Sequence, residues 1–175
     1  EPDKTTEESI QYAKINLAEK KYQRVIIELK NAINKAPEAA EPRYLLGTTY
    51  LTLGNSKAAE KELLRAYELN YNRQDVLAEL AEVYFFEHDV DGVNEIIIQP
   101  EFSPRVKAKI NFYKGVVKLS LASKLEAEKY FDKSVLNEPD GQYGLLASAY
   151  ILTLNNNTDE AHLVVESIIR ENDKF

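Results

Sequence analysis

The sequence predicts an all-α solenoid of antiparallel helix pairs, and three columns of residues at one interval predict it. Stepping by 34 residues from position 13 meets only Gly or Ala: Ala13, Gly47, Ala81, Gly115 and Ala149. A second column is small or β-branched: Val25, Ala59, Val93, Ala127 and Ala161. A third is large and apolar: Leu29, Leu63, Ile97, Phe131 and Val165. A constant period of this length indicates a stack of identical supersecondary units.

The period divides residues 1–175, as a single array, into five repeats of two helices, ten to eleven helices in all. The repeats cover residues 6–39, 40–73, 74–107, 108–141 and 142–175. Each first helix is followed by a short turn, and turns such as Gly54-Asn55-Ser56 and His88-Asp89-Val90 suit helix ends and N-caps. Pro37 and Pro139 end helices.

Gly47 needs a structural reason, because glycine costs about 1 kcal/mol against alanine inside a helix. We expect Gly47 to lie where the first helix of its repeat meets the second, so that a side chain would separate the two backbones. Ala59 and Ala66 are expected to allow the same close approach from the second helix.

The third repeat departs from the pattern. Pro100 stands where the other repeats place the second small residue of the second helix, which predicts a shortened helix that breaks near Gln99. A benign irregularity and a bend in the solenoid are both compatible with this sequence. Pro104 is expected to begin the next repeat.

These residues carry a resemblance to the tetratricopeptide repeat (TPR) family over about residues 6–175. The second repeat fits best, with Leu46-Gly47, Tyr50, Ala59, Leu63 and Ala66. The resemblance implies a right-handed superhelix, whose first helices line a concave groove, and a role in protein–protein interaction. The lack of methionine, even at position 1, and an apolar stripe on the last helix predict a fragment of a longer array.

The first two repeats also resemble a narrower group, through Ile27–Ala32, Pro37, Arg43–Gly47 and Ala59–Ala66. This group is the TPR-repeat lipoproteins of bacterial PEP-CTERM/exosortase systems, which are linked to exopolysaccharide export. The resemblance implies an exported bacterial protein, periplasmic or anchored at the outer membrane, with a cytoplasmic location left open. The lipidated cysteine of that group has no counterpart, because the chain contains no cysteine.

Composition limits the partners and the chemistry. A net charge of −7 argues against nucleic acid, whose binding depends on clusters of Lys and Arg. No apolar run approaches the ~20 residues of a membrane span, so this segment is not expected to insert. His88 and His162 fall in different repeats and are interpreted as surface residues, and no catalytic, metal-binding or cofactor motif occurs. We therefore expect a non-catalytic protein without a cofactor.

The candidate site is a groove for a peptide or helix. The carboxylate clamp of chaperone-binding TPR domains is missing, since Glu41, Asp75 and Glu79 carry the wrong charge. Aromatic residues dominate instead, and acidic neighbours favour a partner with basic residues. The alternatives are a carbohydrate-binding module that stacks sugars on the same rings and an enzyme or its regulatory domain. The predicted groove residues are Tyr44, Thr48, Glu79, Glu82, Phe86, Phe112, Tyr113, Tyr143 and Tyr150.

The end of the chain predicts a further contact. Ala161, Val164, Val165, Ile168 and Ile169 form an apolar stripe at helical spacing. Terminal repeats normally carry a polar cap. The stripe therefore predicts either further repeats or self-association through this last helix.

Overall fold

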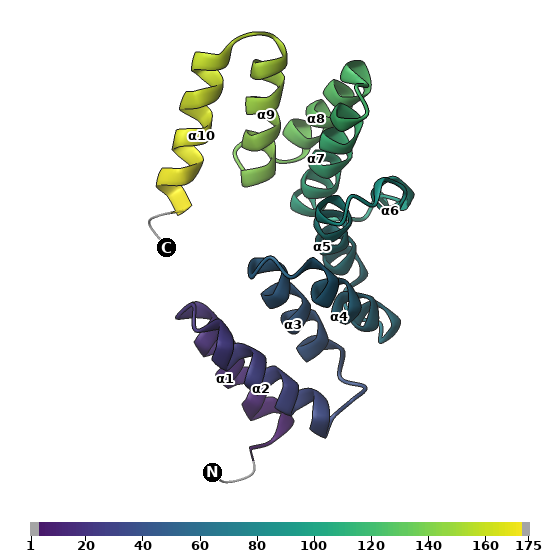
Figure 1. The fold of residues 1–175 in the computed structure, drawn as a ribbon, viewed down its shortest axis with the longest axis vertical. Coiled ribbons are helices and arrows are strands. Elements are labelled where there is room, and N and C mark those ends of the chain that lie inside the picture. Colours follow the sequence, from purple (N-terminus) through teal and green to yellow (C-terminus); the bar gives the residue numbers. More distant parts are fainter. Residues whose placement is uncertain (1–3, 173–175) are drawn as a thin grey trace. The chain divides into compact units, whose positions relative to one another are not determined.

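A computed structural model describes residues 4–172, which form ten α-helices and no strand (Figure 1). The predicted all-α fold class is therefore confirmed. The chain divides into two compact units, an N-terminal unit that ends at Glu87 and a C-terminal unit that begins at His88. The N-terminal unit contains α1 (Thr6–Ala18), α2 (Tyr22–Lys35), α3 (Ala40–Thr52), α4 (Ser56–Glu68) and α5 (Arg73–Phe86). The C-terminal unit contains α6 (Val90–Glu95), α7 (Pro104–Ser120), α8 (Lys124–Asn137), α9 (Gln142–Leu154) and α10 (Thr158–Asn172).

The turn inside each helix pair repeats with the sequence period. First helices end at residues 18, 52, 86, 120 and 154, and second helices begin at residues 22, 56, 90, 124 and 158. Each turn places one residue in the left-handed region, with φ between 56° and 73°: Lys20, Gly54, His88, Ala122 and Asn156. In the first turn the Lys21 N–H donates to the Asn16 carbonyl at 2.8 Å, which satisfies a carbonyl at the helix end. Within each unit, this turn reverses the chain between the two helices of a pair.

In the pairs α1–α2, α3–α4, α7–α8 and α9–α10, the small column lies where the two helices meet. Ala13, Ala81 and Ala149 are at most 6% exposed, and both glycines of the column are buried. A Cβ on Gly47 would lie 2.7 Å from Leu63 Cγ and 3.2 Å from the Leu63 backbone nitrogen. A Cβ on Gly115 would lie 2.6 Å from the Phe131 ring. The expectation for Gly47 is confirmed, because it abuts the second helix of its own repeat.

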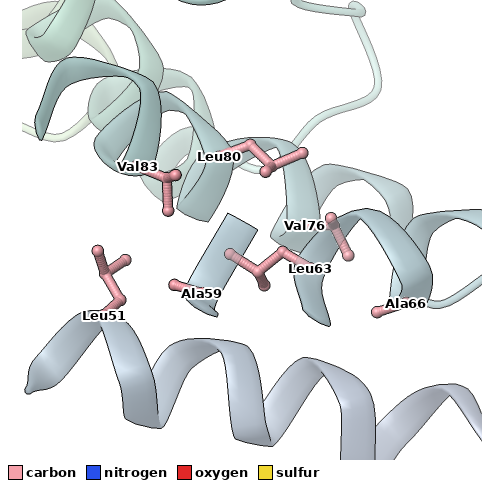
Figure 2. Close-up of a cluster of buried hydrophobic side chains, with 7 residues drawn as sticks. All are labelled: Leu51, Ala59, Leu63, Ala66, Val76, Leu80 and Val83. Carbon is pink, nitrogen blue, oxygen red and sulfur yellow. The ribbon is translucent and has the colours of Figure 1, made fainter. Parts of the chain in front are cut away.

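Two apolar clusters hold the N-terminal unit together. The first joins α1, α2 and α3 through Ala13, Val25, Leu29, Ile33 and Leu46. The second joins α3, α4 and α5 (Figure 2), and its members are Leu51, Ala59, Leu63, Ala66, Val76, Leu80 and Val83. In both clusters, the first helix of one pair packs against both helices of the preceding pair, which makes the stack continuous.

The third pair is shorter than the sequence predicts. Helix α6 ends at Glu95 rather than near Gln99, and Ile96 adopts an extended backbone. A helical Pro100 would leave the Ile96 carbonyl without a donor and would clash with it, so the helix ends before Ile96. The third-column residue Ile97 is consequently 71% exposed, and Ile96 is buried in its place. Pro104 does begin the next helix, capped by Ser103, whose Oγ accepts from the Val106 N–H.

In the C-terminal unit a buried hydroxyl joins three helices. Ser134 of α8 is fully buried, and its Oγ lies 2.9 Å from the Ala108 carbonyl oxygen and 3.1 Å from that of Tyr143. Ser134 occupies the position that alanine fills in the first two repeats, at Ala32 and Ala66. The hydroxyl thus adds a polar link between α7, α8 and α9 at a site of close packing.

Replacing Gly47 by leucine tests the close contact within a pair. We expect a loss of about 1–3 kcal/mol or more in stability, because the added side chain must displace Leu63 and the α4 backbone. Chemical denaturation followed by circular dichroism measures this loss. Thr52→Leu, at an exposed position of the same helix, is the control. A Gly47→Leu melt that overlays the parent would show that the contact is not needed.

Reciprocal substitutions in two turns test how much the left-handed backbone conformation costs a residue with a side chain. Ala122→Gly should stabilise and Gly54→Ala should destabilise the chain, each by about 0.5–1 kcal/mol, since only glycine adopts this region without strain. No atom lies within 4 Å of a Cβ built on Gly54. The change in stability of Gly54→Ala should therefore come from backbone strain and not from a steric clash. Shifts of the same sign in the two denaturation midpoints would refute this account.

Candidate functional site

The candidate site of the N-terminal unit is a face of α3 and α5 that combines carboxylates with aromatic rings. On α5, the residues Asp75, Glu79, Glu82 and Phe86 recur every three or four positions and so share one stripe of the helix. On α3, Glu41, Tyr44 and Thr48 recur in the same way. We call these seven residues, together with Tyr71, the acidic–aromatic face.

Tyr71 links the two helices of this face. Its ring stacks on the Tyr44 ring, with centroids 4.4 Å apart and planes 19° apart. Glu41 in turn pairs with Lys14 of α1 at 2.7 Å. Tyr71 lies between α4 and α5, outside the helical positions that the repeat pattern assigns to a groove, which is why sequence reasoning missed it.

Tyr71 lies close enough to two carboxylates for them to affect its pKa. The pKa of Tyr71 is raised, and partial burial is the largest cause, because it disfavours the phenolate. The carboxylates of Glu41 and Asp75 raise this pKa further. Lys14 has the opposite, smaller effect. A cationic side chain placed here would meet the stacked aromatic pair beside Asp75 and beside Glu41, which already pairs with Lys14.

The other predicted residues of this unit differ in exposure. Glu79, Glu82 and Thr48 are half-buried, and the Thr48 hydroxyl donates to the Leu45 carbonyl of its own helix. Phe86 is 54% exposed, with the Phe85 ring 5.4 Å away. An exposed phenylalanine at the end of an acidic stripe offers an apolar anchor beside charge. Binding by these residues stays a prediction.

The predicted residues of the C-terminal unit form an aromatic cluster. The ring of Phe112 lies 5.3 Å from Tyr113, 5.7 Å from Tyr143 and 5.7 Å from Tyr150. Tyr150 also stacks on Phe131 at 5.0 Å. Phe112, Tyr113 and Tyr143 are at most 8% exposed, whereas Tyr150 is half-buried. The structure thus brings these four predicted residues together, chiefly to pack α7 against α9.

A buried lysine in the C-terminal unit was not singled out from the sequence. Lys114 of α7 is 7% exposed, and its Nζ donates to the Asn94 carbonyl at 2.9 Å. Burial lowers the pKa of Lys114, and the charges of Lys118 and Lys133 lower it further. Since Asn94 lies in the last turn of the short α6, the ammonium satisfies a carbonyl at that helix end.

Within residues 4–172, no group of three or more His, Asp or Glu side chains is placed to hold a metal ion. His88 lies in a turn and His162 on α10, and both are exposed, as predicted. None of the described helices combines the length and the apolar character that crossing a lipid bilayer requires.

The apolar stripe of the last helix is covered in part. Ala161 and Ile168 are at most 8% exposed, Val164 and Val165 are half-buried, and Ile169 is 55% exposed. Helix α9 is the neighbour that contacts α10. The stripe therefore leaves apolar surface open among the described residues.

Comparisons with solved structures agree on the fold. A scan of protein-family models and a search of curated proteins found no match to this sequence. PilF of Pseudomonas aeruginosa is similar over 94% of this chain and 75% of its own, at 17% identity and a TM-score of 0.72. A MamA protein is similar over 97% of this chain and 92% of its own, at 17% identity and a TM-score of 0.67.

A third structure connects the fold with a named repeat. It is a tetratricopeptide repeat protein from Parabacteroides merdae, with 20% identity, a TM-score of 0.66 and coverage of 95% of this chain and 66% of its own. Helix pairs at a constant interval and these similarities define the chain as a repeat protein of the helical-hairpin class. Its fold is that of a tetratricopeptide repeat protein.

The environment of Tyr71 yields a titration prediction. Because its folded pKa is raised above the unfolded value of about 10, Tyr71 stays neutral in the folded chain while the unfolded chain ionises. Stability from this group is therefore fully present below about pH 10 and is lost as the pH rises through the folded pKa. Glu41→Gln should lower the pKa of Tyr71, because it removes a carboxylate and leaves Lys14 uncompensated.

Tyrosine ring signals in NMR, assigned with Tyr71→Phe, measure this pKa. Glu101→Gln, at an exposed position of the C-terminal unit, is the control. An unchanged titration of Tyr71 in Glu41→Gln would contradict the proposed cause of the shift.

Proposed function

We propose that the chain is a non-catalytic scaffold that binds a peptide or helix carrying basic residues on the acidic–aromatic face. The observation that carries this proposal is the Tyr44–Tyr71 stack, with Glu41 and Asp75 close enough to shift the pKa of Tyr71. Two carboxylates beside an aromatic pair suit a Lys or Arg side chain, and the exposed Phe86 suits an apolar neighbour. The TPR fold supports a role in protein–protein interaction in general.

The acidic stripe of α5 sets the charge preference of this surface. Asp75, Glu79 and Glu82 follow one side of the helix, so a partner helix with Lys or Arg every three or four residues could match them in register. Such complementarity acts mainly on specificity and on the association rate, and it weakens with salt.

Sugar binding is the second candidate, and ring accessibility disfavours it. Stacking a sugar requires an open aromatic face. One face of Tyr44 is covered by Tyr71, and Tyr113 and Tyr143 are at most 8% exposed. Phe86 keeps a large exposed area, but it lacks the polar group with which Tyr and Trp hold a sugar hydroxyl.

The biological setting of this function is proposed from the sequence resemblance alone. The similarity to lipoproteins of PEP-CTERM/exosortase systems favours an exported bacterial protein that acts in exopolysaccharide export or surface assembly. In that setting, the scaffold would hold a protein component of the export or assembly machinery.

Two peptides of opposite charge test the proposed function. One labelled helical peptide carries Lys at every fourth position beside leucines, and the other carries Glu in place of each Lys. Fluorescence anisotropy should detect binding of the Lys peptide alone. Glu79→Lys combined with Glu82→Lys should weaken this binding about tenfold or more, the scale of losing a hot-spot contact.

The matched control reverses two exposed charges elsewhere. Glu101→Lys combined with Asp132→Lys changes the net charge equally within the C-terminal unit. Equal losses of affinity in both double variants would show that only net charge matters and would contradict binding at the acidic–aromatic face. Binding of a neutral glucan oligosaccharide, competed by neither peptide, would favour the sugar-binding alternative.

A further inference from the structure

The pair formed by α9 and α10 contains an open apolar groove. A cavity of about 380 Å³ lies between the two helices. Its walls include Leu146, Ala149 and Tyr150 from α9, and Ala161 and Val165 from α10. No helix occupies this cavity among residues 4–172, and its lining is dominated by apolar side chains.

The same groove is filled elsewhere in the chain. Ala149, Ala161 and Val165 are the repeat equivalents of Ala13, Val25 and Leu29, on which α3 packs through Leu46. They are likewise the equivalents of Gly47, Ala59 and Leu63, where α5 packs through Leu80 and Val83. In the C-terminal unit, Tyr150 of α9 stacks on the equivalent Phe131. A first helix therefore occupies each of these three grooves.

Helix α1 carries the matching side chains on an exposed surface. Tyr12 and Ile15 are the repeat equivalents of Leu46 and Thr49 in α3 and of Leu80 and Val83 in α5. Those four equivalents are at most 2% exposed, whereas Tyr12 is 48% and Ile15 is 56% exposed. Ile27 of α2, 59% exposed, extends the same surface. The N-terminal pair thus presents the face that inner first helices bury.

The two segments that carry these surfaces have net charges of opposite sign. Residues 4–35 contain seven Lys or Arg and four Glu, a net charge of +3. Residues 142–170 contain three acidic residues and Arg170, a net charge of −2. Opposite segment charges favour an encounter between the two ends of different copies and disfavour the pairing of either end with its own copy.

We propose that two copies of this chain associate head to tail, with α1 of one copy lying in the α9–α10 groove of the next. Tyr12 and Ile15 enter the groove as Leu80 and Val83 enter theirs, and Val165 receives them as Leu63 does. In assemblies of the 175-residue chain the contact is heterologous, so each copy keeps one open surface and short linear chains can grow. This inference concerns surfaces separate from the acidic–aromatic face and goes beyond the proposed function.

Sedimentation velocity on the 175-residue chain tests this assembly. We expect concentration-dependent association that Ile15→Lys on α1 and His162→Lys in the groove each weaken about thirtyfold or more, the scale of losing a hot-spot residue. Both positions are exposed, so circular dichroism should show folded variants. Leu136→Lys, on α8 and 83% exposed, is the matched control and should associate like the parent.

Mixing the two blocked variants gives the decisive result. Each retains one intact surface, so Ile15→Lys and His162→Lys together should form a one-to-one heterodimer and stop there. A parent chain that stays monomeric up to about 1 mM, where contacts stronger than about −4 kcal/mol are populated, would overturn the proposal. So would full association of Ile15→Lys, which would indicate a symmetric contact, or a mixture that fails to pair.

Discussion

The contact between a small residue of the first helix and a large apolar residue sixteen positions later sets this architecture. At Gly47 and Leu63, and again at Gly115 and Phe131, no room remains even for one additional carbon. Because the two backbones approach this closely at the same place in each pair, every full pair presents nearly the same groove to the next helix. The regular stacking within each compact unit follows from this one contact, with the left-handed turn residue setting where the chain reverses.

The third pair shows what happens when that contact is lost. Pro100 ends α6 before it reaches Ile97, which faces solvent instead. The exposed end of α6 then needs a donor, and Lys114 provides one at a position where the inner helices of the N-terminal unit carry leucine. The early end of α6 caused by Pro100 thus goes with a buried ammonium where leucine would pack. The fold accommodates this charge because Lys114 donates a hydrogen bond to the Asn94 carbonyl.

Much of the fold was predictable because side-chain size alone indicates where the helices of a pair cross. A position that excludes all but Gly and Ala identifies the helix crossing, and its recurrence counts the pairs. The candidate site was less predictable, since the same repeat position can face either a neighbour or solvent. Phe112 is buried because Tyr143 and Tyr150 pack on it, whereas Tyr44 is half-buried and finds its partner, Tyr71, in a linker outside the helical pattern. The end of α6 was misplaced because the proline acts four residues before its own position.

The two compact units build their cores from different side chains. In the C-terminal unit, the large rings of Phe112 and Phe131 consume the space between helix pairs, so aromatic residues there stabilise packing and leave little ring surface for a ligand. In the N-terminal unit, aliphatic residues such as Leu63 and Leu80 form the core. Tyr44, Tyr71 and Tyr84 pack at the edge of this core and stay partly exposed, and the carboxylates of Glu41 and Asp75 raise the pKa of Tyr71 there. The side chains that form the core of each unit therefore determine how much aromatic surface that unit exposes.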